Sequence, residues 1–290
     1  MSFRPKEIEE HTNLYVLHPV SHRLAAGLAR TPLHPNAVSF TGIAFGLLAA
    51  LAYYNFREPG AVWVGFAFMV IWHLLDGTDG HLARLTGKSS TTGKVIDGFA
   101  DYTVYLAVYV ALAAALVPEM GAWVAAVAAL SAASHVLQAA AYERERETYL
   151  FWVYSGEAGK GAPRTEMPKN PLLFGLYYGY LKVQNFLDSS EAVKQHGFDL
   201  AIGPNRRALA AEKYKALYAA HVRQWWMVSA NTHTVAVFLF TALGTPFYYF
   251  MFEIFLLNAI FLVLLADKRR RDREFMAWLA GLPKRQAPTA

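Results

Sequence analysis

The chain has 290 residues, of which 55% are hydrophobic and 17% are charged, and it contains no cysteine. Charged residues make up about a quarter of an ordinary soluble domain, so this composition predicts a membrane protein. It argues against disordered, collagen-like and disulfide-stapled secreted chains, and it excludes thiolate metal sites and cysteine-based catalysis. The formal charge of +5 favours anionic lipid headgroups over nucleic acid as a partner. We expect no secretory signal, because residues 1–35 carry seven charges and no apolar run.

Apolar stretches predict six transmembrane helices, near residues 37–56, 61–84, 95–117, 120–143, 224–243 and 246–266. A helix needs about 20 residues to cross the hydrocarbon core of a bilayer. In the second and third stretches the uncharged part is shorter than this. The second ends at an aspartate and the third begins after one, so we expect these two helices to share a polar end. The last apolar region is too long for one crossing, and Gly244-Thr245-Pro246 divides it.

Basic residues predict the orientation of these helices. With a cytoplasmic N-terminus, the outer loops are residues 57–60, residues 118–119 and the Gly244 turn, and they hold one of the 27 lysines and arginines, Arg57. The positive-inside rule therefore predicts that both termini face the cytoplasm, together with the acidic ends of the second and third spans.

The predicted fold is an all-α integral membrane protein with a single domain over residues 1–290. We expect five parts in it: a cytoplasmic juxtamembrane segment with a helix (1–35), catalytic spans one to four (36–144), a cytoplasmic or interfacial helical insertion (145–222), spans five and six (223–267) and a basic cytoplasmic tail (268–290). Within the insertion, residues 172–187 are aromatic and nearly uncharged, which is typical of a helix at the headgroup level. Tyr177, Tyr178 and Tyr180 would anchor it there, or line a lipid entrance.

The most specific sequence motif lies where the second span ends and the third begins. It reads DGTDGHLAR at residues 76–84 and, after eight residues, GKVIDGFAD at residues 93–101. Residues three and four apart share a helix face, so four carboxylates can point at one another across a tight turn. They would repel unless cations lay between them, and hard oxygen ligands suit magnesium or manganese. A divalent pair is the common arrangement for phosphoryl chemistry. Gly80 and Gly93 would let a bulky ligand approach the backbone. The alternative is that these aspartates only cap helices.

This motif resembles the signature of the CDP-alcohol phosphotransferase (CDP-alcohol phosphatidyltransferase) family, D-x-x-D-G-x-x-A-R, eight residues, G-x-x-x-D-x-x-x-D, and it matches every fixed position. A looser resemblance extends to the six-span layout and to Pro35-Asn36, but not to residues 145–222. The family moves a phosphate-linked group from a CDP-activated donor to an alcohol, releases CMP and commonly works as a homodimer.

The resemblance implies a set of site residues. Two divalent ions, Mg²⁺ or Mn²⁺, would bind Asp76, Asp79, Asp97 and Asp101, and Asp101 would also be the general base. CDP would contact Asp76, Asp79, Gly80, Ala83, Arg84 and Gly93. The chemistry is consistent, because an alcohol is a weak nucleophile that needs a proton acceptor and an arginine donates well to phosphate oxygens.

The motif leaves the lipid substrate open. The compact, alanine-rich chain resembles prokaryotic members, so we expect a bacterial inner membrane enzyme of phospholipid biosynthesis that uses CDP-diacylglycerol. Its acceptor would be a small alcohol such as inositol, glycerol phosphate, serine or choline. The alternative is a CDP-headgroup donor with a diacylglycerol-like lipid or ceramide. A magnesium-dependent polyprenyltransferase is less favoured because we find no second aspartate-rich motif, and a cation transporter because the acidic residues lie at one membrane edge.

Other polar residues are candidates for acceptor or headgroup contact, namely His233, Glu253 and Lys94. Glu253 lies inside the sixth span, where a charge is costly, so the alternative is an internal pair with a residue such as His233. For the polar segment 231–234 we weigh a substrate contact against helix–helix hydrogen bonds. We expect His73 to pack within the bundle and His81 to be solvated, with a phosphate contact as the alternative for both.

Overall fold

The computed structural model describes the backbone of residues 5–88, 91–158, 175 and 204–282. It describes the side chains of the same residues except 91–99, 155–158 and 204–205. All elements of this described part are helical, which confirms the predicted all-α class.

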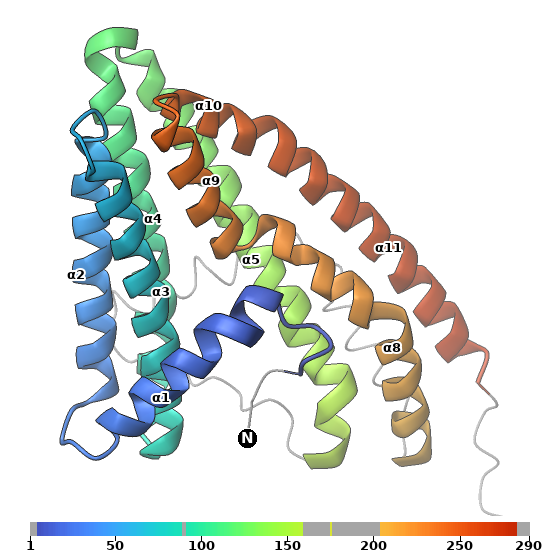
Figure 1. Ribbon diagram of the computed structural model, residues 1–290. Helices are drawn as coiled ribbons and strands as arrows, with labels where there is room; N and C mark the ends of the chain where they lie inside the picture. Colours follow the sequence, from blue (N-terminus) through green and yellow to red (C-terminus); the bar gives the residue numbers. More distant parts are fainter. Residues whose placement is uncertain (1–4, 89–90, 159–174, 176–203, 283–290) are drawn as a thin grey trace, which may run out of the picture.

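The N-terminal half contains a short π-helical turn and five α-helices. These are η1 (Asn13–Leu17), α1 (His18–Leu28), α2 (Pro35–Tyr54), α3 (Ala61–Leu85), α4 (Thr91–Met120) and α5 (Trp123–Ala158). In Figure 1, α2, α3 and α4 stand side by side, and α1 crosses α3 near its C-terminal end. His34 and Pro35 fix the start of α2, because the His34 Nδ1 accepts a hydrogen bond from the Asn36 amide at 3.2 Å and proline favours the first helical position.

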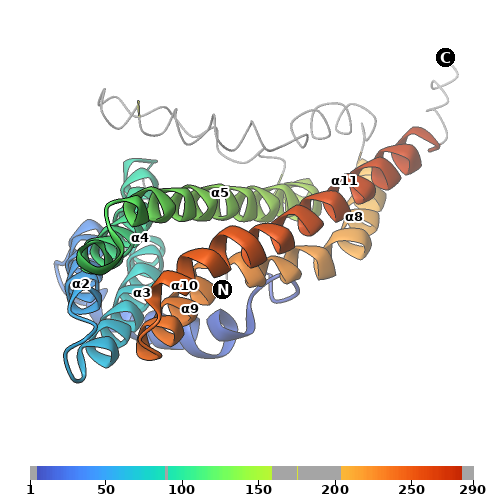
Figure 2. The ribbon, with the colours of Figure 1, turned by 90° about the horizontal axis from the view of Figure 1, so that it is seen from above.

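The C-terminal half is broken into more pieces. It contains α8 (Pro204–Gln224), the 3₁₀ turn η2 (Trp225–Val228), α9 (Ala230–Ala242), α10 (Pro246–Met251), the π-helical turn η3 (Phe252–Leu257) and α11 (Asn258–Ala280). Seen from above, α5, α8 and α11 extend away from the group formed by α2, α3 and α4 (Figure 2). The described part therefore has two regions, a three-helix group with α9 and α10 against it, and an elongated group of α5, α8 and α11.

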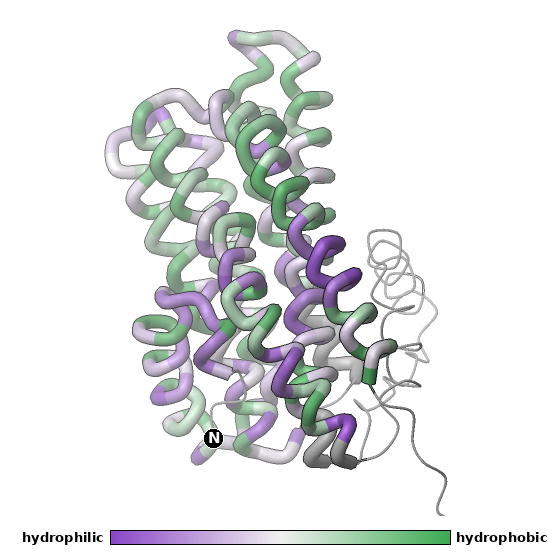
Figure 3. The backbone as a smooth tube through the Cα atoms, turned by 90° about the vertical axis from the view of Figure 1, so that its right-hand side faces the viewer, coloured by the Kyte–Doolittle hydropathy of each residue, from purple (hydrophilic) through white to green (hydrophobic). Residues whose placement is uncertain are grey.

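Each region has its own apolar core. The first is built around Tyr53, Trp72 and Val104, whose exposed fractions are 2% or less. The second packs Tyr214 and Phe275 with other aromatic side chains of α5, α8 and α11. In Figure 3 the hydrophobic colour dominates the upper half of the view and hydrophilic residues are more frequent in the lower half. The acidic motif lies at the C-terminal end of α3 and in the N-terminal part of α4. The predicted polar end shared by the second and third spans is thus observed.

In the part of the chain that the structure describes, five helical segments are long and apolar enough to cross a membrane: residues 35–54, 61–85, 100–120, 123–154 and 246–280. They agree with five of the predicted spans. The fifth predicted span, 224–243, is not one helix. Ser229 is extended (φ −86°, ψ 165°), and α9 has 13 residues, about 20 Å, which is shorter than the hydrocarbon core of about 30 Å. The count of six spans is therefore not confirmed.

The break at Ser229 has a local cause. The Ser229 hydroxyl and the Asn231 amide donate to the same buried carboxylate oxygen of Glu10, at 3.1 and 2.8 Å. Extended backbone at residue 229 turns these polar groups toward the N-terminal segment. A straight helix would leave them among apolar side chains, where unpaired polar groups are costly.

Two other boundaries differ from the expectation. The predicted outer turn at residues 118–119 is wrong, because α4 continues through Pro118 to Met120. Gly121 follows it with φ 87°, and its amide donates to the Val117 carbonyl. Only glycine adopts such a left-handed cap without strain. The fourth span continues past residue 144 to Ala158. The predicted interfacial helix with Tyr177, Tyr178 and Tyr180 lies outside the described residues.

A close crossing of α2 and α4 supplies a test of this packing. A Cβ added at Gly46 would overlap the side chain of Val104, whereas one added at Gly42, on the same helix, would make ordinary contacts of 3.5 Å with Leu75 and Trp72. We expect Gly46→Ala to lower the free energy of unfolding by about 1–3 kcal/mol through overpacking. Thermal unfolding in detergent measures this, with Gly42→Ala as the matched control. Equal melting temperatures for the two variants would contradict the crossing.

Candidate active site

The motif spans the facing ends of α3 and α4. Five of its residues, Asp76, Asp79, Gly80, Ala83 and Arg84, lie in the last three turns of α3, and Asp101 lies in α4. The side chains of Asp97, Gly93 and Lys94 fall outside the described residues. Helices α3 and α4 each pack against α2, so the two halves of the motif share one end of one bundle.

Asp79 is the most enclosed of the described aspartates, with 5% of its surface exposed. The hydroxyl of Ser39 on α2 donates to Asp79 Oδ2. A hydrogen bond to the charged form of a carboxylate stabilises that form and fixes its direction. Sequence reasoning missed Ser39. The sequence feature that could have identified Ser39 is its position, since it places a hydroxyl in an apolar helix one turn after Pro35-Asn36.

Helix α1 packs behind the motif on another face of α3. The Ser21 hydroxyl donates to the Leu74 carbonyl at 2.9 Å, and a Cβ on Gly77 would lie 2.7 Å from the same hydroxyl oxygen. Gly77 is thus a glycine because α1 approaches there, a role that the sequence analysis did not assign. The juxtamembrane helix is thereby fixed directly against the motif.

Thr234 on α9 joins the two motif helices. Its hydroxyl lies 2.8 Å from His73 Nε2 on α3 and 2.8 Å from the hydroxyl of Tyr105 on α4. His73 precedes Asp76 by three residues, and Tyr105 follows Asp101 by four, so both contacts lie about one helical turn from an aspartate. The expectation that His73 packs within the bundle is confirmed. The helix–helix alternative for segment 231–234 is also observed at this threonine.

Arg84 folds back along its own helix. A Cβ on Gly80 would lie 3.4 Å from the Arg84 Nη1, and the Arg84 Nη2 lies 3.2 Å from His81 Nδ1. The side chain is exposed, and His81 is half-buried and not simply solvated as predicted. The guanidinium therefore lies against the backbone of Gly80, where an added Cβ would make ordinary contact with it.

His233 and Glu253, two of the predicted headgroup contacts, meet each other. The His233 Nδ1 lies 2.9 Å from Glu253 Oε2, and both side chains are fully buried. The His135 ring stacks on His233 with the ring centroids 3.6 Å apart. The structure thus shows the internal pair that the sequence offered as the alternative for Glu253. Glu253 lies in η3, and single π-helical turns often mark functional positions.

The donor set of the motif fits hard divalent cations. Asp76, Asp79 and Asp101 offer only carboxylate oxygens, which suit magnesium or manganese. Among the described side chains, which omit Asp97, no group of three or more histidines and carboxylates is arranged to hold a metal ion.

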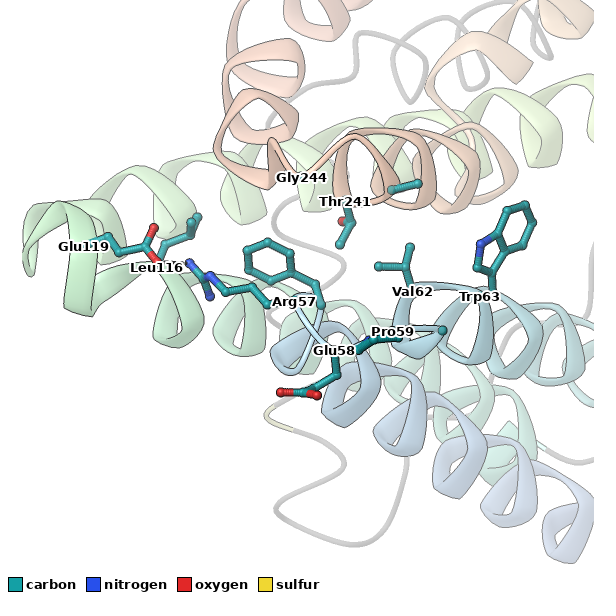
Figure 4. A pocket seen from close by; sticks show the side chains of 12 residues that line it. Arg57, Glu58, Pro59, Val62, Trp63, Leu116, Glu119, Thr241 and Gly244 are labelled. Atoms are coloured by element: carbon teal, nitrogen blue, oxygen red, sulfur yellow. Dashed lines mark ion pairs between the residues drawn. The ribbon is translucent and has the colours of Figure 1, made fainter.

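A hollow of about 530 Å³ lies at the end of the bundle opposite the motif (Figure 4). It is lined by the turn after α2, the end of α4 and the turn after α9. Arg57 pairs there with Glu119 at 2.6 Å, and its Nη1 donates to the Ala115 carbonyl at 3.2 Å. Because these contacts occupy the arginine, the hollow does not offer a free cation to a phosphate, and the motif end is the better candidate for chemistry.

The Thr234 bridge can be tested through stability. Thr234→Val keeps the side-chain shape and removes the hydroxyl that Tyr105 and His73 share. We expect a loss of about 1–3 kcal/mol in the free energy of unfolding, because two buried polar groups lose a partner. Thr241→Val on the same helix is the matched control, since the Thr241 hydroxyl bonds only to the Val237 carbonyl of its own helix. If thermal unfolding shows the same loss for both variants, Thr234 does not tie the helices together.

The comparisons with known proteins agree with this site. Residues 32–154 match the model of the CDP-alcohol phosphatidyltransferase family. The match begins just before α2 and ends in α5, so it includes Ser39 and the whole motif. No curated protein matches the chain. The chain therefore carries a CDP-alcohol phosphatidyltransferase domain over residues 32–154, the domain of a family of enzymes that transfer substituted phosphate groups.

Proposed function

We propose that the protein transfers a phosphatidyl unit from CDP-diacylglycerol to the hydroxyl of a small alcohol and releases CMP. The observation that carries this proposal is the complete motif at the polar ends of α3 and α4, with Asp79 fixed by Ser39. A reaction centre at the end of two membrane helices suits one lipid substrate and one water-soluble substrate. The protein would be a phospholipid-biosynthetic enzyme of a bacterial inner membrane, with both termini and the site facing the cytoplasm, and it would work as a homodimer.

The motif residues have distinct roles in this proposal. Asp76, Asp79, Asp97 and Asp101 would hold two divalent cations, and Gly80, Ala83, Arg84 and Gly93 would lie along the CDP group. The bound cations would screen the negative charge of the pyrophosphate. Arg84, exposed beside Gly80, would donate to phosphate oxygens.

Asp101 would accept the proton of the acceptor alcohol. The alcohol oxygen forms a bond to the phosphorus of the phosphatidyl group, the bond from that phosphorus to the bridging oxygen breaks, and CMP leaves with the electron pair. Asp101 is half-buried on α4, one turn before the Tyr105 contact with Thr234. This contact supports the role, because a general base must keep its position relative to the reacting hydroxyl.

The substrate assignment is tested with purified protein and defined substrates. CDP-diacylglycerol and CDP-headgroup donors are each offered with a panel of alcohols, and the products are identified by mass spectrometry. We expect phosphatidyl products and CMP only from CDP-diacylglycerol. Products only from a CDP-headgroup with diacylglycerol or ceramide would reverse the donor assignment. Absence of CDP binding in the presence of magnesium would instead point to a polyprenyltransferase or a cation transporter.

Metal dependence is a separate prediction. Excess chelator should abolish turnover, and magnesium or manganese should restore it, because the carboxylates alone repel the pyrophosphate. The measurement is the rate of CMP release before and after the metal is returned. Full activity in excess chelator would rule out a metal role.

Asp101→Asn tests the general base. The amide keeps the size of the side chain but accepts no proton, so turnover should fall by about a hundred-fold or more while CDP binding survives. CDP affinity and the CMP release rate are measured on the same preparation. Loss of CDP binding without a separate defect in turnover would reduce Asp101 to a ligand.

A further inference from the structure

Charged residues fill positions 267–274 of α11, directly after the apolar part of the helical run formed by α10, η3 and α11. The sequence does not tell which face of the helix each of them occupies. The structure divides them into a buried pair, a group that is paired on the surface, and two arginines that have no such partner. None of the roles proposed above uses these residues.

The buried pair fixes the rotation of α11. Lys268 and Asp272 are 4% and 7% exposed, and the Lys268 Nζ lies 2.7 Å from Asp272 Oδ2. The same ammonium lies 3.6 Å from Glu145 Oε1 of α5. The hydroxyl of Tyr218 on α8 donates to Asp272 Oδ1 at 2.6 Å. These contacts hold one face of α11 against α5 and α8.

The surface group uses its charges within the protein. Asp267 accepts hydrogen bonds from the Arg270 Nη2 at 2.6 Å and from the Arg271 Nε at 2.7 Å. Glu274 pairs with Lys213 of α8 at 3.5 Å. These two arginines are therefore occupied, although Arg270 is exposed.

Arg269 and Arg273 are different. Both are exposed, and neither makes a hydrogen bond or ion pair with any residue in the part of the chain that the structure describes. Each follows a member of the buried pair by one residue, so it points about 100° away from that pair. Residues four apart are neighbours on a helix surface, so the two guanidinium groups lie side by side. In Figure 1, α11 forms the outer edge of the elongated group.

The face that carries these two arginines becomes apolar toward the bundle. At intervals of three and four residues before Arg269 it continues through Ala266 to Leu262. Leu262 is 63% exposed, and its neighbour Val263 is 69% exposed. One uncovered stretch of α11 thus changes from aliphatic to cationic within about two helical turns.

Helix length places this change at the edge of the bilayer. Residues 246–266 contain one charged residue, Glu253, and at 1.5 Å per residue they rise about 30 Å, the thickness of the hydrocarbon core. Arg269 follows by about one turn, at the depth of lipid phosphates, whereas Leu262 lies one turn inside the hydrocarbon. A phospholipid has acyl chains next to a phosphate, so both of its parts fit this stretch. A soluble phosphate would leave the exposed leucine and valine uncovered.

We propose that Arg269 and Arg273 bind the headgroup of an anionic phospholipid in the leaflet through which α11 leaves the membrane, with Leu262 and Val263 against its acyl chains. Guanidinium groups donate to phosphate oxygens, and two unpaired cations side by side attract a headgroup with net negative charge. They repel the ammonium of a zwitterionic lipid. This inference does not depend on the proposed phosphatidyl transfer.

The test uses the full chain, purified in detergent with excess chelator so that no divalent ion joins a lipid to the aspartates. Native mass spectrometry gives the Kd of the first bound dioleoylphosphatidylglycerol and, separately, of dioleoylphosphatidylcholine. We expect the anionic lipid to bind about ten-fold more tightly. Arg269→Gln and Arg273→Gln should each raise its Kd by about five-fold, the effect of one basic residue at a membrane surface, and leave the Kd of phosphatidylcholine within about two-fold.

The control is Arg30→Gln, which removes the same charge from an exposed arginine in the turn after α1 and should change the Kd of phosphatidylglycerol by less than about two-fold. Glycerophosphoglycerol, the same headgroup without acyl chains, should not compete. If Arg30→Gln weakens binding as much as Arg269→Gln, the effect is one of total charge and the site is refuted. Equal affinity for the two lipids, or competition by glycerophosphoglycerol, would also overturn the assignment to an anionic lipid.

Discussion

The repulsion between aspartates at the ends of two membrane helices is the constraint on which the rest of the structure depends. Asp76, Asp79 and Asp101 lie where α3 and α4 meet, beside the apolar core around Tyr53, Trp72 and Val104. Helices that carry like charges at one end separate unless other contacts oppose the repulsion. Thr234 of α9 supplies such a contact, because its hydroxyl lies against both His73 of α3 and Tyr105 of α4. Ser39 of α2 and Ser21 of α1 fix α3 from two other helices.

These contacts are few and polar for a physical reason. Apolar packing in a membrane does not select one register between helices, because lipid tails are as apolar as the side chains. A hydroxyl that bonds to a carboxylate or a histidine has one satisfactory position. Ser39 and Thr234 therefore fix the heights of α2 and α9 against the motif helices, and the tight fit of Gly46 on Val104 fixes the distance between α2 and α4.

Sequence alone predicted the parts of the fold that depend on apolar length and on the motif. The first four spans and the last one are found, and the polar ends of α3 and α4 coincide as expected. The turn after α4 was placed too early because Pro118 was read as a break, whereas the helix continues through it to Met120 and Gly121 forms the cap. The prediction of one helix over residues 224–243 failed because a hydropathy pattern carries no information about distant partners. Here the partner is Glu10, whose carboxylate accepts hydrogen bonds from Ser229 and Asn231.

The candidate site was predictable to the same extent. Spacing along one helix identified the aspartates, but Ser39 reaches Asp79, and Thr234 reaches the neighbouring His73 and Tyr105, from other helices. A pattern of three and four residues carries no information about such partners. The pair of His233 and Glu253 could be stated as an alternative because an isolated charge in a membrane needs a partner, yet only the structure chose between the two roles.

The N-terminal segment also contacts the part of the chain beyond residue 154, which the family match does not cover. Arg223 at the end of α8 donates to the Glu7 carbonyl at 3.0 Å, and the hydroxyl of Tyr149 on α5 donates to the Glu7 carboxylate at 3.2 Å. Burial raises the pKa of the nearby Glu10 carboxyl, while the hydrogen bonds from Asn231 and Ser229 oppose that rise. One segment thus contacts α5, α8 and the start of α9 and then continues into α1, behind the motif. Contacts formed outside the matched residues, with Arg223 and Asn231, thus help to hold the segment that leads into α1.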